Sequence, residues 1–160
     1  MYFLVVVTLI LEMVLAFFTS MFTGITLRSP RSAWFTIGLA GMLGWWASQS
    51  LSGKNIPELV AAVAGAVVIG TFAEIMARVQ KHPVTVYIVS GIIPLVPGII
   101  AYNSMLSFLE KEFTRGLFLA FRAFLIASYL AAGVAVVPLI IRHFRLLVSR
   151  RRKTLKTDRP

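Results

Sequence analysis

Five long apolar runs alternate with short polar segments along the chain. They cover about residues 2–27, 33–51, 57–77, 84–109 and 117–141. About 20 apolar residues in a helix cross the hydrocarbon core of a bilayer, and each run reaches or approaches that length. The segments between the runs are too short to fold as domains. The pattern predicts an all-α polytopic integral membrane protein with five transmembrane helices over 1–141, followed by a tail over 142–160.

The fourth run is interrupted at its centre by the sequence PLVPG, residues 94–98. Pro94 and Pro97 lack a backbone N–H, and each would clash with the carbonyl group one turn earlier in a helix. Gly98 is able to take the left-handed backbone conformation, and Gly91 adds freedom just before the prolines. The sequence therefore predicts that the fourth helix is broken into two half-helices joined by an irregular link. A simple proline kink is the alternative interpretation.

An irregular link inside a membrane exposes backbone N–H and carbonyl groups. Because each unsatisfied group facing lipid costs several kcal/mol, the link is expected to be buried in protein or to line a wet cavity. Broken helices of this kind build substrate sites in many secondary transporters, where the positive end of a half-helix receives an anionic group. Gly91, Pro94, Pro97 and Gly98 are therefore candidate substrate-binding positions. Tyr102 and Asn103, which follow on the second half-helix, are candidates for polar contacts.

Composition supports the membrane assignment. Hydrophobic residues make up 58% of the 160 residues and charged residues only 14%, whereas soluble domains average about 45–50% and about 25%. The net charge of +10 raises the possibility of nucleic-acid binding, but half of the 16 basic residues lie after Ile141, directly behind an apolar run. Such a cluster is typical of a cytoplasmic tail that contacts anionic lipid headgroups, and no nucleic acid is expected. A tail that docks nucleic acid or protein is the alternative.

The placement of basic residues also predicts the orientation of the chain. If the tail is cytoplasmic, the first and third loops are cytoplasmic too, and the inner side carries twelve basic residues against three outside. The outer three are Lys54, Lys111 and Arg115. Positive charge is enriched on the cytoplasmic side of membrane proteins. The sequence therefore predicts an inner-membrane protein with its N-terminus outside and its C-terminus inside.

Glu12 lies about halfway along the first run, where a carboxylate is costly and is a functional candidate by default. It is expected to face the bundle interior and either to couple transport to protons or gate it, or to act as a neutral hydrogen-bonding group between helices. Glu74 and Arg78 stand four residues apart on one helix face, at ion-pair spacing. Arg122 either extends to the membrane surface or faces the cavity as a contact for an anion.

Catalytic chemistry is not expected. The chain has no cysteine, no P-loop pattern and no set of nucleophile, base and acid, and its two histidines stand apart. The sequence therefore predicts neither an enzyme nor a metal site, and no cofactor.

The segment that runs from Ala77-Arg78 through His82-Pro83 and GIIPLVPG (91–98) to Tyr102 resembles the threonine/serine exporter (ThrE) family. More closely, it is similar to the small, YjjB-type subunit that forms one half of a split exporter. Ser29-Pro30-Arg31 before a glycine-rich second run also fits. Pro94, Pro97, Gly98 and Tyr102 fall on the family motif, and an acidic residue at a place similar to Glu12 is a family feature.

The resemblance implies a subunit that exports small polar metabolites together with a larger membrane partner. Threonine and serine are the implied cargo of fused members, and dicarboxylates such as succinate are the implied cargo of split ones. The sequence also leaves open whether the chain forms a homo-oligomer. The rival hypotheses are a non-transporting assembly subunit, whose small residues in the second and third runs dock a partner, and a channel lined by the break.

Overall fold

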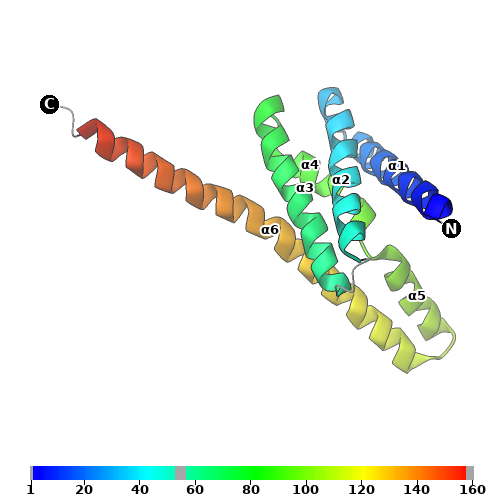
Figure 1. Cartoon of the computed structure of the whole chain (residues 1–160). Coiled ribbons are helices and arrows are strands. Elements are labelled where there is room, and N and C mark those ends of the chain that lie inside the picture. The colour runs from blue at the N-terminus through cyan, green and yellow to red at the C-terminus, as the bar shows by residue number, and fades with distance from the viewer. Residues whose placement is uncertain (1, 53–56, 158–160) are drawn as a thin grey trace.

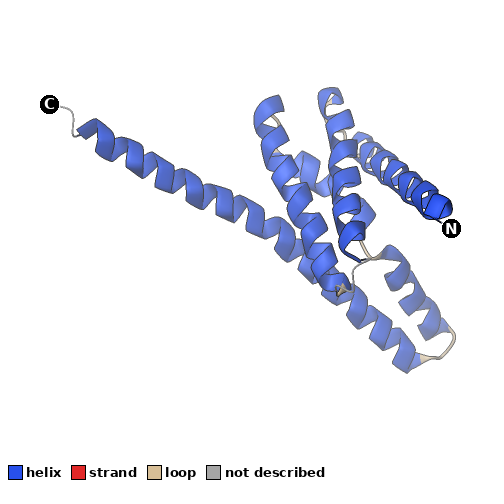
Figure 2. Cartoon of the chain, in the orientation of Figure 1, coloured by secondary structure: helices blue, strands red, loops and turns tan. Residues whose placement is uncertain are grey.

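The computed structural model describes residues 2–52 and 57–157, with side chains from residue 6 to 52 and from 57 to 139. In these ranges the chain is helical and contains no strand (Figure 2). The helices are α1 (Tyr2–Thr26), η1 (Arg31–Ala33), α2 (Trp34–Ser52), α3 (Glu58–Gln80), α4 (Val84–Gly91), η2 (Ile93–Leu95), α5 (Gly98–Leu109) and α6 (Phe113–Thr157). The predicted all-α class is confirmed, and α3 and α6 extend beyond the predicted runs.

Small residues bring α1, α2 and α3 into close contact (Figure 1). The buried positions of α2 are nearly all glycine or alanine. A Cβ atom built on Gly65 of α3 would lie 2.9 Å from the carbonyl oxygen of Gly44 in α2, and one on Gly41 of α2 would lie 3.3 Å from the carbonyl oxygen of Ala16 in α1. These backbones therefore approach each other at distances that a larger side chain would prevent, as small residues permit between membrane helices.

Polar contacts tie the α1–α2 and α3–α4 connections together at one end of the bundle. Ser32 Oγ lies 2.9 Å from the Nε2 atom of His82. The fully buried Tyr87 of α4 donates a hydrogen bond of 2.7 Å to Gln80 Oε1 at the end of α3. The first and third loops therefore lie on the same side of the bundle, as the alternation of spans requires.

The helices α5 and α6 form a hairpin that extends away from the other helices (Figure 1). Ser104 Oγ of α5 donates a hydrogen bond of 2.7 Å to the Gly116 carbonyl oxygen. The first half of α6 then packs against α3 in parallel: Arg122 meets Glu58, and further along Val137 meets Gly70. Beyond that contact α6 diverges from the bundle (Figure 1).

The helix α6 contains 45 residues, which corresponds to about 68 Å at the usual rise per residue. It remains helical beyond residue 141, through most of the predicted tail. The side chains of that tail, and Lys54 in the second loop, lie outside the part of the chain that the structure describes. The predicted lipid contact of the tail stays a prediction.

Three helices in the described part of the chain are long and apolar enough to cross a membrane: Val6–Thr26, Glu58–Gln80 and Phe113–Leu139. The pair Val84–Leu95 and Gly98–Leu109, bent by 53°, would make a fourth crossing if it forms one span. The helix α2 does not reach this level because glycine, serine and Gln49 reduce its hydropathy. It packs between α1 and α3, so it has less lipid-facing surface to cover. The five-span count stays a prediction.

Candidate functional site

The link between α4 and α5 is a short series of tight turns. After Gly91 the chain forms the 3-10 turn Ile93–Leu95, and Val96 is extended. Pro97 has φ −75° and ψ 55°, and the Gly98 N–H donates a hydrogen bond of 2.7 Å to the Val96 carbonyl. This geometry is an inverse γ-turn. The left-handed conformation considered for Gly98 is wrong, because no described glycine has positive φ and Gly98 begins α5 in helical geometry. Pro97 makes the turn instead.

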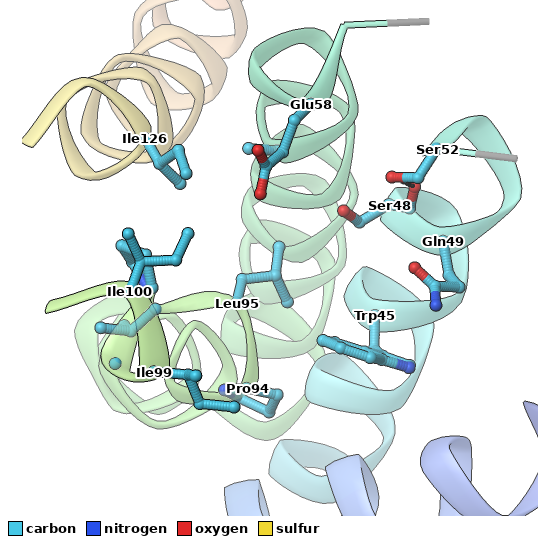
Figure 3. Close-up of a pocket in the computed structure, with 14 residues that line it drawn as sticks. Trp45, Ser48, Gln49, Ser52, Glu58, Pro94, Leu95, Ile99, Ile100 and Ile126 are labelled. Atoms are coloured by element: carbon cyan, nitrogen blue, oxygen red, sulfur yellow. Dashed lines mark hydrogen bonds between the residues drawn. The ribbon is translucent and has the colours of Figure 1, made fainter. Parts of the chain in front are cut away.

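A cavity of about 320 Å³ lies against this link (Figure 3). Its walls come from the end of α2, the beginning of α3, the link with the first residues of α5, and α6. The polar lining side chains are Ser48, Gln49 and Ser52 of α2 and Glu58 of α3. Volumes of this size are typical of small-molecule sites, which combine apolar walls with a few polar groups. The link is therefore exposed to a space that can hold a small molecule.

Backbone donors add to the polar lining. The N–H of Ala101 donates to the Pro97 carbonyl, but within the described chain no acceptor satisfies the N–H groups of Ile99 and Ile100. Both residues line the cavity. The first N–H groups of a helix have no partner inside the helix and carry its partial positive charge. The beginning of α5 therefore offers this space unsatisfied donors suited to an anionic group.

Glu12 of α1 lies in a second cavity of about 230 Å³ on the other side of Trp45. Trp45 and Pro94 line both cavities. Gln49, which lines the first cavity, places its Nε2 atom 3.5 Å from Glu12 Oε2. The half-buried Glu12 is therefore separated from the link cavity by one tryptophan and one proline, with Gln49 between them.

Trp45 holds a further unsatisfied donor. Its indole Nε1 is buried and has no hydrogen-bond partner in the described structure. A buried donor without a partner costs free energy that a ligand, a water molecule or a rearrangement can recover. Sequence analysis alone did not identify Trp45 as a cavity residue, because a tryptophan near a helix end is typical of interface anchors.

Not all predicted substrate-binding residues reach the cavity. Pro94, Pro97 and Gly98 line it, whereas Tyr102 is 65% exposed and Asn103 is exposed on α5. Neither lines the cavities described above. Gly91 is buried in packing: a Cβ atom there would lie 3.2 Å from Ile69 Cγ2. Gly91 therefore serves helix packing in this structure.

Two ion pairs involve the predicted charged residues. Arg78 Nη2 lies 2.6 Å from Glu74 Oε2 on α3. Arg122 binds Glu58, through its Nε at 3.1 Å and through its Nη2, both to the same carboxylate oxygen. Glu58 was missed from the sequence, although its place directly after Pro57 in the first turn of α3 is where an acid is stabilised by the helix dipole.

A model of the family described as threonine/serine exporter, ThrE, matches residues 12–140. No curated protein and no solved structure matches the chain. The match includes Glu12, the whole link and both cavities, and stops before the basic end of α6. It is a match to a family of transporters rather than enzymes.

Proposed function

The chain belongs to the threonine/serine exporter (ThrE) family, and on that premise we propose that it is one membrane half of an exporter of small polar metabolites. The cargo class is amino acids such as threonine and serine, with dicarboxylates such as succinate as the alternative. The other half is a larger membrane subunit of the same family. The observation that carries the proposal is the cavity against the link, lined by Pro94, Pro97 and Gly98.

The link supplies the reason for a binding site at this place. Irregular backbone is tolerated at membrane depth only where protein or water satisfies it. The N–H groups of Ile99 and Ile100 are unsatisfied and border the cavity. A carboxylate of the cargo, which both threonine and succinate carry, would accept hydrogen bonds from them. Substrate then binds at the bend between α4 and α5.

Glu12 is proposed to couple export to protons or to gate it. It is the titratable side chain among the residues that line the second cavity, and Gln49 faces it from α2. Protonation of Glu12 would change its contact with Gln49, and Gln49 also lines the link cavity. A change in the protonation of Glu12 therefore reaches the substrate site through the residues that lie between the two cavities, which are Gln49, Trp45 and Pro94.

Membrane placement completes the proposal. Five spans, with α2 as the second and the bent pair α4–α5 as the fourth, put the two termini on opposite sides of the membrane. The excess of basic residues in the first and third loops and the tail then puts the N-terminus outside and the C-terminus inside. The contact of Ser32 with His82 supports this arrangement, because it puts the first and third loops, which carry Arg28, Arg31, Arg78 and Lys81, on one side.

The assembly alternative is less well supported than the exporter. An assembly subunit was expected to dock a partner through the small residues of α2 and α3, but Gly44 and Gly65 face one another within this chain. A channel would conduct cargo without dependence on a proton gradient. That dependence distinguishes a channel from a coupled exporter.

Efflux of labelled threonine and succinate from cells tests the proposal. Three strains are compared: one expresses this chain, one its candidate larger partner, and one both. Efflux only in the third establishes a split exporter and identifies its cargo. Efflux with this chain alone would mean that it is a complete transporter, and no efflux in any strain, with both proteins in the membrane, would overturn the proposal.

A further inference from the structure

The link cavity contains a single charged lining residue in the described structure, Glu58 of α3. Arg122 of α6 binds it through two nitrogens, but both contact the same oxygen, Oε2. The other oxygen, Oε1, has no partner among the described residues. Glu58 therefore presents a negative charge and a free acceptor to the space next to the link.

The ion pair is not what holds α3 and α6 together. Both side chains are 48% exposed, so packing around them does not lock either one in place. The two helices instead pack through a buried cluster further along, made by Ala62 and Ala66 of α3 and Ile126 and Leu130 of α6. The pair can open while the helices stay in place.

We propose that Glu58 and Arg122 form a charge-selective entrance to the cavity. In the empty site the two side chains bind each other. A zwitterionic cargo exchanges partners with them: its ammonium group binds Glu58 and its carboxylate binds Arg122 or the N–H groups of Ile99 and Ile100. This inference rests on the proposed export function and deepens it, because it assigns the residues that choose among cargoes.

The charges of Glu58 and Arg122 explain why the entrance would prefer an amino acid to a dicarboxylate. A dicarboxylate can satisfy Arg122, but it offers no cation to Glu58 and adds negative charges beside it. An unpaired carboxylate and a contact between like charges both weaken the binding of such a ligand. The entrance therefore favours an amino acid over succinate, whereas the backbone donors at the link would accept a carboxylate from either.

The test is a set of charge variants of the full chain, expressed with its candidate partner. In Glu58→Gln, the preference for threonine over succinate in efflux is expected to fall by roughly ten- to hundredfold, the range for losing a hydrogen bond to a charged group. The matched control is Glu112→Gln, which removes the exposed pair of Glu112 with Arg115 at 3.1 Å, away from both cavities. The control is expected to keep the wild-type preference.

A double exchange, Glu58→Arg with Arg122→Glu, separates selectivity from structure. It can restore the ion pair, but the cavity-lining charge becomes positive, so the preference is expected to shift towards succinate. Return of the wild-type preference in this variant would show that the pair is only structural and would overturn the proposal. An unchanged preference in Glu58→Gln would overturn it as well.

Binding to the purified chain provides a readout that does not need transport. Threonine is expected to raise the Tm of the wild-type protein and of Glu112→Gln, but not that of Glu58→Gln. A wild-type chain that binds threonine in this way without exporting it would refute the exporter function and leave the entrance standing. A Tm shift of equal size in Glu58→Gln would refute the entrance.

Discussion

Single residues decide how closely the helices approach. A Cβ atom on Gly65 would lie 2.5 Å from Leu95 Cδ2 and 2.9 Å from the Gly44 carbonyl oxygen, whereas one on Gly98 would meet nothing within 4 Å. Gly65 therefore fixes two contacts at once, of α3 with α2 and of α3 with the link. Gly98 has open space because it faces the cavity.

Gly65→Ala is expected to destabilise the protein by about 1–3 kcal/mol, since overpacking moves backbones that have no room to yield. Thermal unfolding of the purified protein in detergent measures this loss. The matched control is Gly98→Ala, whose added methyl group meets no neighbour and whose backbone is already helical. Equal Tm values for the two variants would contradict the packing assigned to Gly65.

At Glu12 the prediction concerns coupling. Export by the wild-type protein is expected to rise when the outside is made more acidic than the inside, and Glu12→Gln is expected to lose this response because glutamine cannot bind the proton. Efflux at a series of imposed pH gradients measures the difference. The control is Glu110→Gln, at an exposed position after α5. A Glu12→Gln variant with gradient-driven export like that of the wild type would exclude the coupling role.

The elements follow from the sequence more closely than the side-chain contacts do. The apolar runs located α1 to α3 to within a few residues. The prolines lie between the end of α4 and the beginning of α5, and the break as a feature of a membrane span stays a prediction. Tyr102 was assigned to the site because it follows the link closely, but α5 packs on α6 through Ser104 and Ser107. Successive helix residues differ by about 100° in direction, so Tyr102 points away from that buried face.

Contacts between segments that are far apart in the chain could not be predicted from the sequence. Glu58 and Arg122 are 64 residues apart, and only the parallel packing of α3 and α6 brings them together. A clue was present in the polar residues Ser48, Gln49 and Ser52 near the end of an apolar run. Such residues indicate a polar wall, although they do not show what stands opposite.

Changes in the link between α4 and α5 are expected to abolish export without preventing insertion of the protein into the membrane. Pro97→Ala restores an N–H that can donate to the carbonyl of Ile93, and Gly98→Leu fills the cavity side of α5. The double variant is expected to reach the membrane in normal amounts and to lose export. Pro138→Ala, at a proline inside α6 that lines neither cavity, is the control and is expected to retain export. Normal flux in the double variant would contradict the link as the substrate site.

A separate prediction is that water reaches the cavity beside the link. The chain has no cysteine, so a single introduced thiol reports on its own position. Ile99→Cys, against the cavity, is expected to react with a water-soluble maleimide several-fold faster than Met105→Cys. Met105 is also exposed in the structure, at 64%, but is predicted to face lipid. Equal rates would argue that the cavity holds no water.

For the whole molecule, the prediction is orientation. On intact cells, a membrane-impermeant maleimide is expected to label Lys111→Cys, between α5 and α6, and to leave Lys81→Cys, after α3, unmodified. Permeabilised cells provide the control, since both positions then react. The reverse pattern on intact cells would place the N-terminus inside and would contradict the proposed orientation.

The helix α6 connects the helix bundle to the basic end of the chain without interruption. Its first half packs on α3, its last described buried side chain is Val137, and the helix then continues to Thr157 without a neighbour in the bundle. Within α6, Pro138 is the place where a bend costs least, because its missing N–H leaves the Val134 carbonyl without its helical partner. A small tilt of the membrane half swings the basic end through a larger arc. Any protein or lipid surface that holds that end would also hold the helix that packs on α3 and contributes Ile126 to the wall of the link cavity.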